Sequence, residues 1–143
     1  MKYLLIPNSI LLNIIRNVQR SYPYEVAGVL LGSEFRDFYK VRTVYHFKKC
    51  RITEYSFNFD IMEWMHVITN GRRSGLAYLG LYHSHPNAHA IPSNIDIHRM
   101  IECPGEIWLI IALPEANTIE YAAYTVLDPA SALLKLNIII SEN

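Results

Sequence analysis

Apolar residues recur along this chain at two spacings, which separate the segments expected to be helices from those expected to be strands. Between residues 8 and 21 they fall three and four positions apart, as on the buried face of a helix. Asp60 and Ser93 each stand where a side chain can accept the first backbone N–H groups of a later helix. The sequence therefore predicts helices over about 8–21, 61–70 and 93–102.

The remaining apolar residues lie in short runs that predict strands. Residues 26–32 and 106–113 are almost wholly apolar, which is typical of strands covered on both faces, whereas 39–47 alternates. The expected strands are 3–6, 26–32, 39–47, 55–59, 77–83, 106–113, 118–127 and 133–140. The basic segment 48–51 is expected to be a solvated loop. Helices that alternate with and flank these strands predict an α/β (α+β) protein with a mixed sheet, folded as a single domain over residues 1–143.

Composition narrows the classes of function. Hydrophobic residues make up 51% of the 143 positions, enough for a folded core, and the formal net charge of +0 leaves no basic footprint for nucleic acid. No apolar run is long enough to span a membrane. Cys50 and Cys103 lack CxxC spacing, which argues for a reducing compartment. We therefore expect a cytoplasmic protein that binds neither nucleic acid nor membrane.

Chemistry concentrates at the end of one expected strand. His83 and His85 are two residues apart, so both imidazoles face the same side of a strand, and Pro86 ends that strand because it cannot donate to a sheet ladder. Asp96 lies three residues after Ser93, in the first turn of the helix that Ser93 caps. Two imidazoles and one carboxylate suit Zn²⁺, and three protein ligands leave the fourth position open, as in catalytic zinc sites.

Each half of this pattern has a plainer interpretation. Ser93 and Asp96 can form a variant capping box that only starts a helix. His83 and His85 can be a partly exposed pair without a ligand. The two halves together, with Pro86 and a short loop between them, favour a metal site.

The run His-Ser-His-Pro at residues 83–86, followed after six residues by Ser-Asn-Ile-Asp at 93–96, resembles the JAMM motif of the MPN-plus zinc metalloproteases. That motif also has an upstream glutamate before a glycine-containing strand, and Glu25 ahead of residues 26–32 resembles it. The resemblance extends from residue 7 to about 113, and a bare domain of this size is similar to the minimal prokaryotic JAB-domain members. It implies a curved mixed sheet flanked by helices, broadly like the cytidine-deaminase fold.

The resemblance also implies roles for individual residues. It implies one zinc ion per chain, with the ligands His83, His85 and Asp96. Glu25 is then the general acid/base for the attacking water, and Ser93 helps to stabilise the tetrahedral oxyanion. Ser84, between the two histidines, is expected to hydrogen-bond the substrate backbone.

The implied activity is that of a zinc-dependent metalloprotease or isopeptidase. Such an enzyme hydrolyses the amide or isopeptide bond after the C-terminal Gly-Gly tail of a ubiquitin-like or sulfur-carrier protein. An extended tail of that kind can pair with an edge strand near the site, and exposed edge strands on an apolar domain also permit a homodimer. Two alternatives remain: a non-catalytic MPN scaffold that binds protein partners, and another zinc hydrolase such as a deaminase, whose Pro-Cys-x-x-Cys signature is absent.

Overall fold

The computed structural model describes residues 2–48, 50–53, 56–115, 117–128 and 132–142. Its strands are β1 (Tyr3–Pro7), β2 (Ala27–Glu34), β3 (Phe38–His46), β4 (Cys50–Thr53), β5 (Ser56–Phe59), β6 (Ala77–Pro86), β7 (Ile107–Leu113), β8 (Glu120–Thr125) and β9 (Leu134–Ser141). Its helices are α1 (Asn8–Ser21), α2 (Ile61–Arg73) and α3 (Asn94–Glu102). No helix in the described ranges is long and apolar enough to cross a membrane. Lys49 and Tyr55, in an expected loop and an expected strand, lie outside those ranges.

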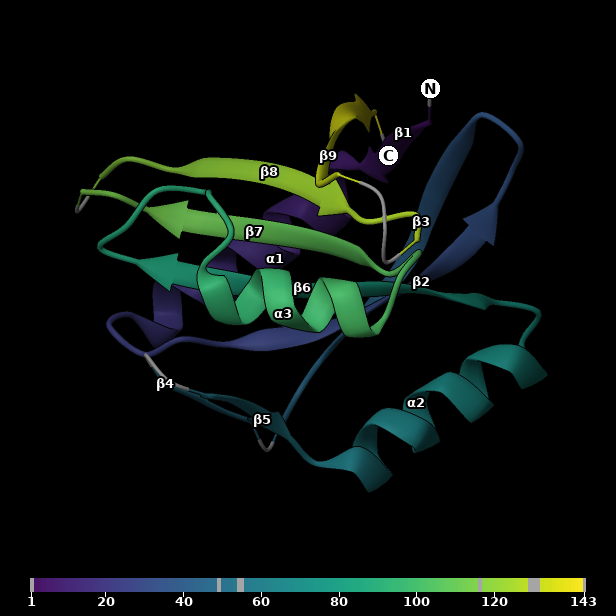
Figure 1. Cartoon of the computed structure of the whole chain (residues 1–143), viewed down its shortest axis with the longest axis horizontal. Coiled ribbons are helices and arrows are strands. Elements are labelled where there is room, and N and C mark those ends of the chain that lie inside the picture. The colour runs from purple at the N-terminus through teal and green to yellow at the C-terminus, as the bar shows by residue number, and fades with distance from the viewer. Residues whose placement is uncertain (1, 49, 54–55, 116, 129–131, 143) are drawn as a thin grey trace.

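Seven strands form one mixed sheet that closes on itself, in the order β1-β3-β2-β6-β7-β8-β9, because β1 pairs with both β3 and β9 (Figure 1). The central strand β6 runs antiparallel to β2 and parallel to β7. The expected mixed sheet is confirmed. The edge strand expected near the site is wrong for this sheet, because β6 is paired on both sides. Among the described strands, the two-stranded β4–β5 hairpin is the sheet that keeps free edges.

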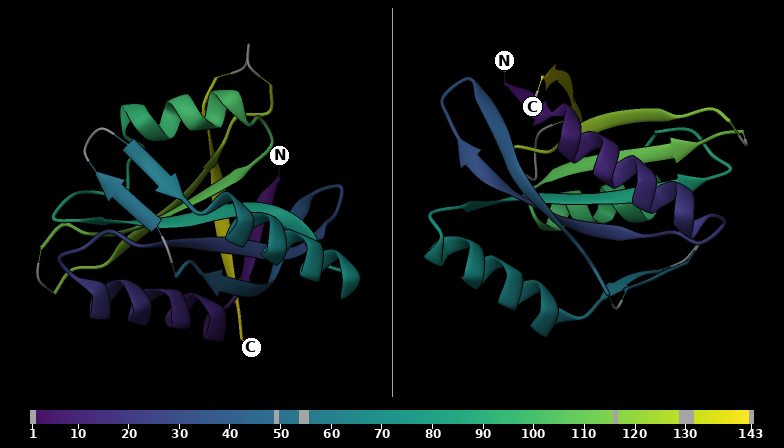
Figure 2. Two further views of the ribbon diagram at one scale, coloured as in Figure 1. Left: turned by 90° about the horizontal axis from the view of Figure 1, so that it is seen from below. Right: turned by 180° about the vertical axis from the view of Figure 1, so that it is seen from behind.

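The sheet carries a hydrophobic core on each face. All of β7 is buried, and its successive side chains point to opposite faces. Leu109 and Ile111 belong to the core cluster that contains Ile14 of α1, whereas Trp108 belongs to the cluster that contains Met100 of α3. Figures 1 and 2 show the result, with α3 lying across one face of the sheet and α1 across the other. This arrangement places the segment that carries the motif on the α3 face.

The helix α2 extends beyond its expected end. The sequence predicted a helix over about 61–70 that Gly71 would close, whereas the helix continues to Arg73. Gly71 is buried, and a β-carbon there would lie 3.2 Å from a methyl group of Leu31. The glycine therefore lets α2 pack closely on β2 rather than ending the helix.

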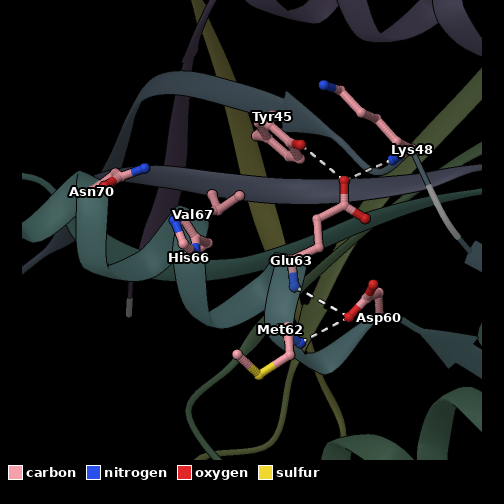
Figure 3. Close-up of a pocket in the computed structure, with 8 residues that line it drawn as sticks. All are labelled: Tyr45, Lys48, Asp60, Met62, Glu63, His66, Val67 and Asn70. Carbon is pink, nitrogen blue, oxygen red and sulfur yellow. Dashed lines mark hydrogen bonds between the residues drawn. The ribbon is translucent and has the colours of Figure 1, made fainter.

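Two carboxylates hold the start of α2. Asp60 caps the helix as expected, by accepting from the first backbone N–H groups. Glu63 accepts from the hydroxyl of Tyr45 and from the N–H of Lys48, which ties α2 to the end of β3 (Figure 3). A hollow of about 370 Å³ lies beside these contacts, and none of the predicted metal ligands lines it.

The strand β4 corrects the expectation of a solvated loop at residues 50 and 51, whereas Lys48 lies in an exposed bend. Cys50 and Ile52 pack against the core on the α3 face, whereas Arg51 between them is exposed. Pairing with β5 completes a short hairpin. The alternation of a strand was therefore present, but the density of basic residues concealed it.

Candidate metal centre

The strand β6 brings two imidazoles to one side of the sheet. His83 and His85 lie near its end and are buried, and the His83 ring meets the ring of Trp108 edge-on, with centroids 5.3 Å apart. This contact puts both histidines on the α3 face. The chain turns away at Asn87, whose φ of 62° is left-handed and whose N–H donates to the carbonyl of Leu113.

The start of α3 supplies the carboxylate. The Ser93 hydroxyl accepts from the N–H of Asp96 at 3.2 Å, and the N–H of Ser93 donates to Asp96 Oδ2 at 2.8 Å. These reciprocal bonds form a capping box, as the simpler interpretation of Ser93 and Asp96 predicted. The same bonds also fix the buried carboxylate of Asp96 at the helix start, directed at the two histidines.

The three side chains meet at distances that suit a metal ion. Asp96 Oδ1 lies 3.1 Å from His83 Nε2, and Asp96 Oδ2 lies 3.2 Å from His85 Nε2. One ligand atom from each residue lies within 4.8 Å of the other two. Tetrahedral zinc with ligands at about 2.0–2.2 Å requires ligand atoms roughly 3.3–3.6 Å apart. The three side chains are therefore close enough together to hold a metal ion after small movements.

The hydrogen bonding of His85 selects the ring nitrogen that a metal needs. Its Nδ1 lies 3.1 Å from the carbonyl oxygen of His89, so Nδ1–H donates to that carbonyl. The lone pair of a neutral His85 is then on Nε2, which faces Asp96. A backbone carbonyl bonded to the outer nitrogen is the usual support for a metal-binding histidine.

Burial and charge shift the pKa values of these three residues in different directions. Burial lowers the pKa of His83 to about 4, although the Asp96 charge opposes the shift. Burial also acts to lower the pKa of His85, but the hydrogen bond and charge of Asp96, together with the His89 carbonyl and the Glu25 charge, raise it overall. Burial alone would raise the pKa of Asp96, but its contacts with His85, His83 and Ser93 hold it below the ordinary value. His83 is therefore neutral at pH 7, as a metal ligand must be.

Glu25 lies between α1 and β2, beside the cluster, and is half-buried. Burial raises its pKa; the His85 charge acts to lower the pKa and the Asp96 charge to raise it. Glu25 is thus within electrostatic reach of two of the predicted ligands. The structure therefore brings all the residues that the motif singled out to one end of β6.

Ser84 connects Glu25 to the strand that carries the histidines. Its side chain is fully buried, and its hydroxyl accepts from the N–H of Val26 at 2.9 Å. The N–H of Ser84 also donates to the carbonyl of Val26. These two bonds hold the residue after Glu25 against β6. Contact between Ser84 and a substrate stays a prediction.

The loop after β6 forms one rim of the site. The ring of His89 lies 3.1 Å from the carboxylate of Glu120 at the start of β8. Tyr22, near Glu25, donates its O–H to the Asn87 side chain. A hollow of about 390 Å³ lies between the loop and β8, lined by His89, Ala90, Ile91, Ile119, Glu120, Tyr121, Ala122, Tyr124 and Lys135. None of the predicted metal ligands lines this hollow, but His89, which does, accepts a hydrogen bond from His85 through its carbonyl.

Sequence reasoning missed one polar residue near the centre. Glu106 was expected only as the first residue of an apolar strand, yet it is buried and accepts hydrogen bonds from Tyr78, Arg99 and Trp108. The available signal was a lone glutamate at the start of a run of apolar residues. Its partners come from distant segments, so the sequence did not reveal its environment. His98, by contrast, lies at the surface and pairs with Glu102 on the same helix.

Comparison with known proteins gives a family match and a shared fold. The model of prokaryotic homologues of the JAB domain matches residues 7–124. A solution structure of a protein from Desulfitobacterium hafniense has a TM-score of 0.84 and 24% identity, covering 98% of this chain and 94% of that one. A solution structure from Salinibacter ruber has a TM-score of 0.72 and 22% identity, covering 99% and 92%. No curated protein matches the chain. At these identities the two structures show the fold alone.

Proposed function

The chain belongs to the family of prokaryotic homologues of the JAB domain, and we propose that it is a zinc-dependent metallopeptidase. Its substrate would be the amide or isopeptide bond after the Gly-Gly tail of a ubiquitin-like or sulfur-carrier protein. One observation carries the proposal: His83, His85 and Asp96 converge in a buried group, with Glu25 beside it.

The ligand set fits zinc rather than a harder cation. Two imidazole nitrogens and one carboxylate oxygen are common zinc ligands, whereas Ca²⁺ and Mg²⁺ prefer oxygen ligands alone. Bound zinc would supply Lewis-acid chemistry, polarising a carbonyl and activating water. Three ligands from the protein leave room for the reacting groups.

Glu25 is proposed to move the proton. Its raised pKa brings the carboxylate closer to the working pH, where one group can serve as base and then as acid. Glu25 would take a proton from the attacking water and later deliver it to the leaving amine. The Val26–Ser84 hydrogen bonds hold this part of the chain in place while the proton moves.

Ser93 is proposed to stabilise the oxygen that gains negative charge. Its Oγ accepts from the N–H of Asp96, which uses an acceptor site and leaves the O–H free to donate. Ser93 is exposed at the start of α3, so this O–H can reach a substrate oxygen. A fixed donor of this kind typically contributes a factor of about 10²–10³ to turnover.

The sequence predicted that a Gly-Gly tail pairs with an edge strand near the site, without identifying the strand. Because β6 has neighbours on both sides, we propose that the tail pairs with the β4–β5 hairpin. That hairpin follows Phe47, whose N–H donates to Ala27, and Ala27 pairs with His83 across β2 and β6. The hairpin therefore starts close to the cluster. The hollow between residues 87–91 and β8 would hold the leaving segment.

A cleavage assay with two substrates tests the function. A ubiquitin-like protein with a short C-terminal extension and one in an isopeptide linkage are incubated with the zinc-loaded chain and with Glu25→Gln. We expect cleavage after Gly-Gly, and a loss of at least about 100-fold in Glu25→Gln with zinc content unchanged. The matched control is Glu102→Gln, an exposed glutamate on α3.

Each outcome of this assay has a distinct meaning. Full activity in Glu25→Gln contradicts the role of Glu25. Zinc binding without cleavage of either substrate favours the alternative, a non-catalytic MPN scaffold that binds protein partners. A chain that binds no zinc removes the metal centre and the peptidase together.

A further inference from the structure

We propose that Glu106 is a positioning residue for the metal centre, because its buried carboxylate fixes α3 against the sheet and thereby sets Asp96 relative to His83. The inference rests on the proposed zinc site. The hydrogen bonds of Glu106 go to Tyr78, Arg99 and Trp108, and we propose that it acts through these neighbours.

The carboxylate of Glu106 is fully engaged. Oε1 accepts from Arg99 Nε at 3.1 Å and from Trp108 Nε1 at 3.0 Å. Oε2 accepts from Arg99 Nη2 at 3.0 Å and from the hydroxyl of Tyr78 at 2.5 Å. Glu106 is only 7% exposed, so little water competes for these bonds. One side chain therefore joins α3, β6 and β7.

The first connection leads to Asp96. Arg99 follows Asp96 by three residues on α3, so their side chains lie on neighbouring parts of one helix face. The two bonds from one guanidinium to one carboxylate fix distance and orientation, which a single ammonium bond does not. The guanidinium also lies over the ring of Phe59, 5.3 Å from its centroid. These contacts hold the first turns of α3 at a defined height above the sheet.

The second connection leads to His83. Trp108 is fully buried, and the bond from its Nε1–H to Glu106 fixes the indole in one orientation. The indole meets the His83 ring edge-on, with the ring planes at 83°. Trp108 thus packs against His83 and limits the orientations of its ring. Glu106 therefore acts on a ligand from the helix and on a ligand from the strand.

Stability alone does not explain a buried charge at this position. Replacing buried ion pairs with apolar residues of similar volume is often neutral or stabilising. What an apolar side chain cannot supply is the directional contact with an arginine fork, an indole and a phenol. We therefore expect the effect of Glu106 to appear in metal binding, beyond its effect on unfolding.

The test measures zinc affinity of Glu106→Gln by competition with a chelator. The glutamine amide turns an N–H donor toward donors on Arg99 or Trp108, so α3 loses its fixed position. We expect zinc affinity to fall about 10- to 100-fold, the range typical of residues that support metal ligands. The visible spectrum of the Co²⁺-substituted protein should change as well, because it reports coordination geometry.

Two controls separate positioning from general destabilisation. Glu102→Gln removes an exposed glutamate from the same helix and should leave both readouts unchanged. Ile14→Val removes a methyl group from the core on the opposite face, so it should lower stability without changing zinc affinity or the cobalt spectrum. Arg99→Lys keeps the charge but not the fork, and it should weaken zinc binding less than Glu106→Gln does.

Every outcome decides the inference. Wild-type zinc affinity in Glu106→Gln overturns it, as does an equal loss in Ile14→Val at matched stability. If Glu106→Gln does not fold, Arg99→Lys and Trp108→Phe decide instead, and wild-type affinity in both overturns the inference. A wild-type chain that binds no zinc overturns the proposed function as well, whereas zinc binding unaffected by Glu106→Gln overturns only this inference.

Discussion

At the scale of single residues, one carboxylate faces two histidines that hold protons very differently. His83 is enclosed by the sheet and Trp108, and burial keeps it neutral. Burial also acts to lower the pKa of His85, but the contacts with Asp96, the His89 carbonyl and the Glu25 charge together raise it. The two imidazoles of the metal-free centre therefore take up protons at different pH, His85 before His83 as the pH falls, and this difference has a measurable consequence.

Zinc binding should displace one proton in weakly acidic solution. His85, whose pKa is raised above the ordinary histidine value, carries a proton in weakly acidic solution, whereas His83, whose pKa is about 4, stays neutral there. The pKa of Asp96 is lowered, so its carboxylate stays ionised in this window. As the pH falls from about 6.5 to 4, zinc affinity should fall about tenfold per unit. Calorimetric titration in buffers of different ionisation enthalpy measures the protons released, and two protons per zinc would contradict the assignment.

Residue spacing predicted that the three candidate ligands would lie together because the geometry is local. His83 and His85 follow from alternation along a strand, and Asp96 follows from the cap at Ser93. Glu25 came only from the family resemblance, since a glutamate at a strand start is otherwise ordinary. Glu106 was missed because its partners on β6, α3 and β7 become neighbours only after folding.

At the scale of elements, the start of α3 has two functions. The Ser93 hydroxyl caps the helix, and the proposed mechanism also uses its free O–H. Ser93→Ala should lower the free energy of unfolding by about 1 kcal/mol, the usual cost of a lost N-cap, and should also reduce turnover. Asp60→Ala removes the cap of α2 and is the matched control, with a similar loss of stability but unchanged turnover.

Urea unfolding of the zinc-free proteins and cleavage rates of the zinc-loaded proteins provide both measurements. Equal turnover in the Ser93 and Asp60 variants would mean that Ser93 acts only as a helix cap. A loss of turnover without a loss of stability would instead mean that its bond to the Asp96 N–H contributes little to the helix.

Helices were predicted more reliably than the pairing of strands. The apolar spacing of α1 and the caps of α2 and α3 depend on residues close together in the sequence, and those helices are present. Closure of the sheet requires β1 to pair with β9, at the other end of the chain. No local pattern encodes that contact, so open edges were expected where the structure has a closed sheet.

At the scale of the whole molecule, the closed sheet provides a rigid support with a separate core on each face. α1 covers one face, and α3 on the other carries Asp96 over the strand that carries the histidines (Figure 1). The centre therefore depends on how one helix docks on one sheet. The loop after β6 and the β4–β5 hairpin lie outside this closed sheet, and they are the parts proposed to contact substrate.

The most direct test of the central claim is a zinc titration of cleavage. Metal-free protein receives zinc in steps up to two equivalents, and the initial rate of cleavage after a Gly-Gly tail is measured at each step. The account predicts a rate that rises to one equivalent and then stays constant, with Glu25→Gln inactive throughout. A rate that is independent of zinc, or activity in zinc-loaded Glu25→Gln, would contradict it.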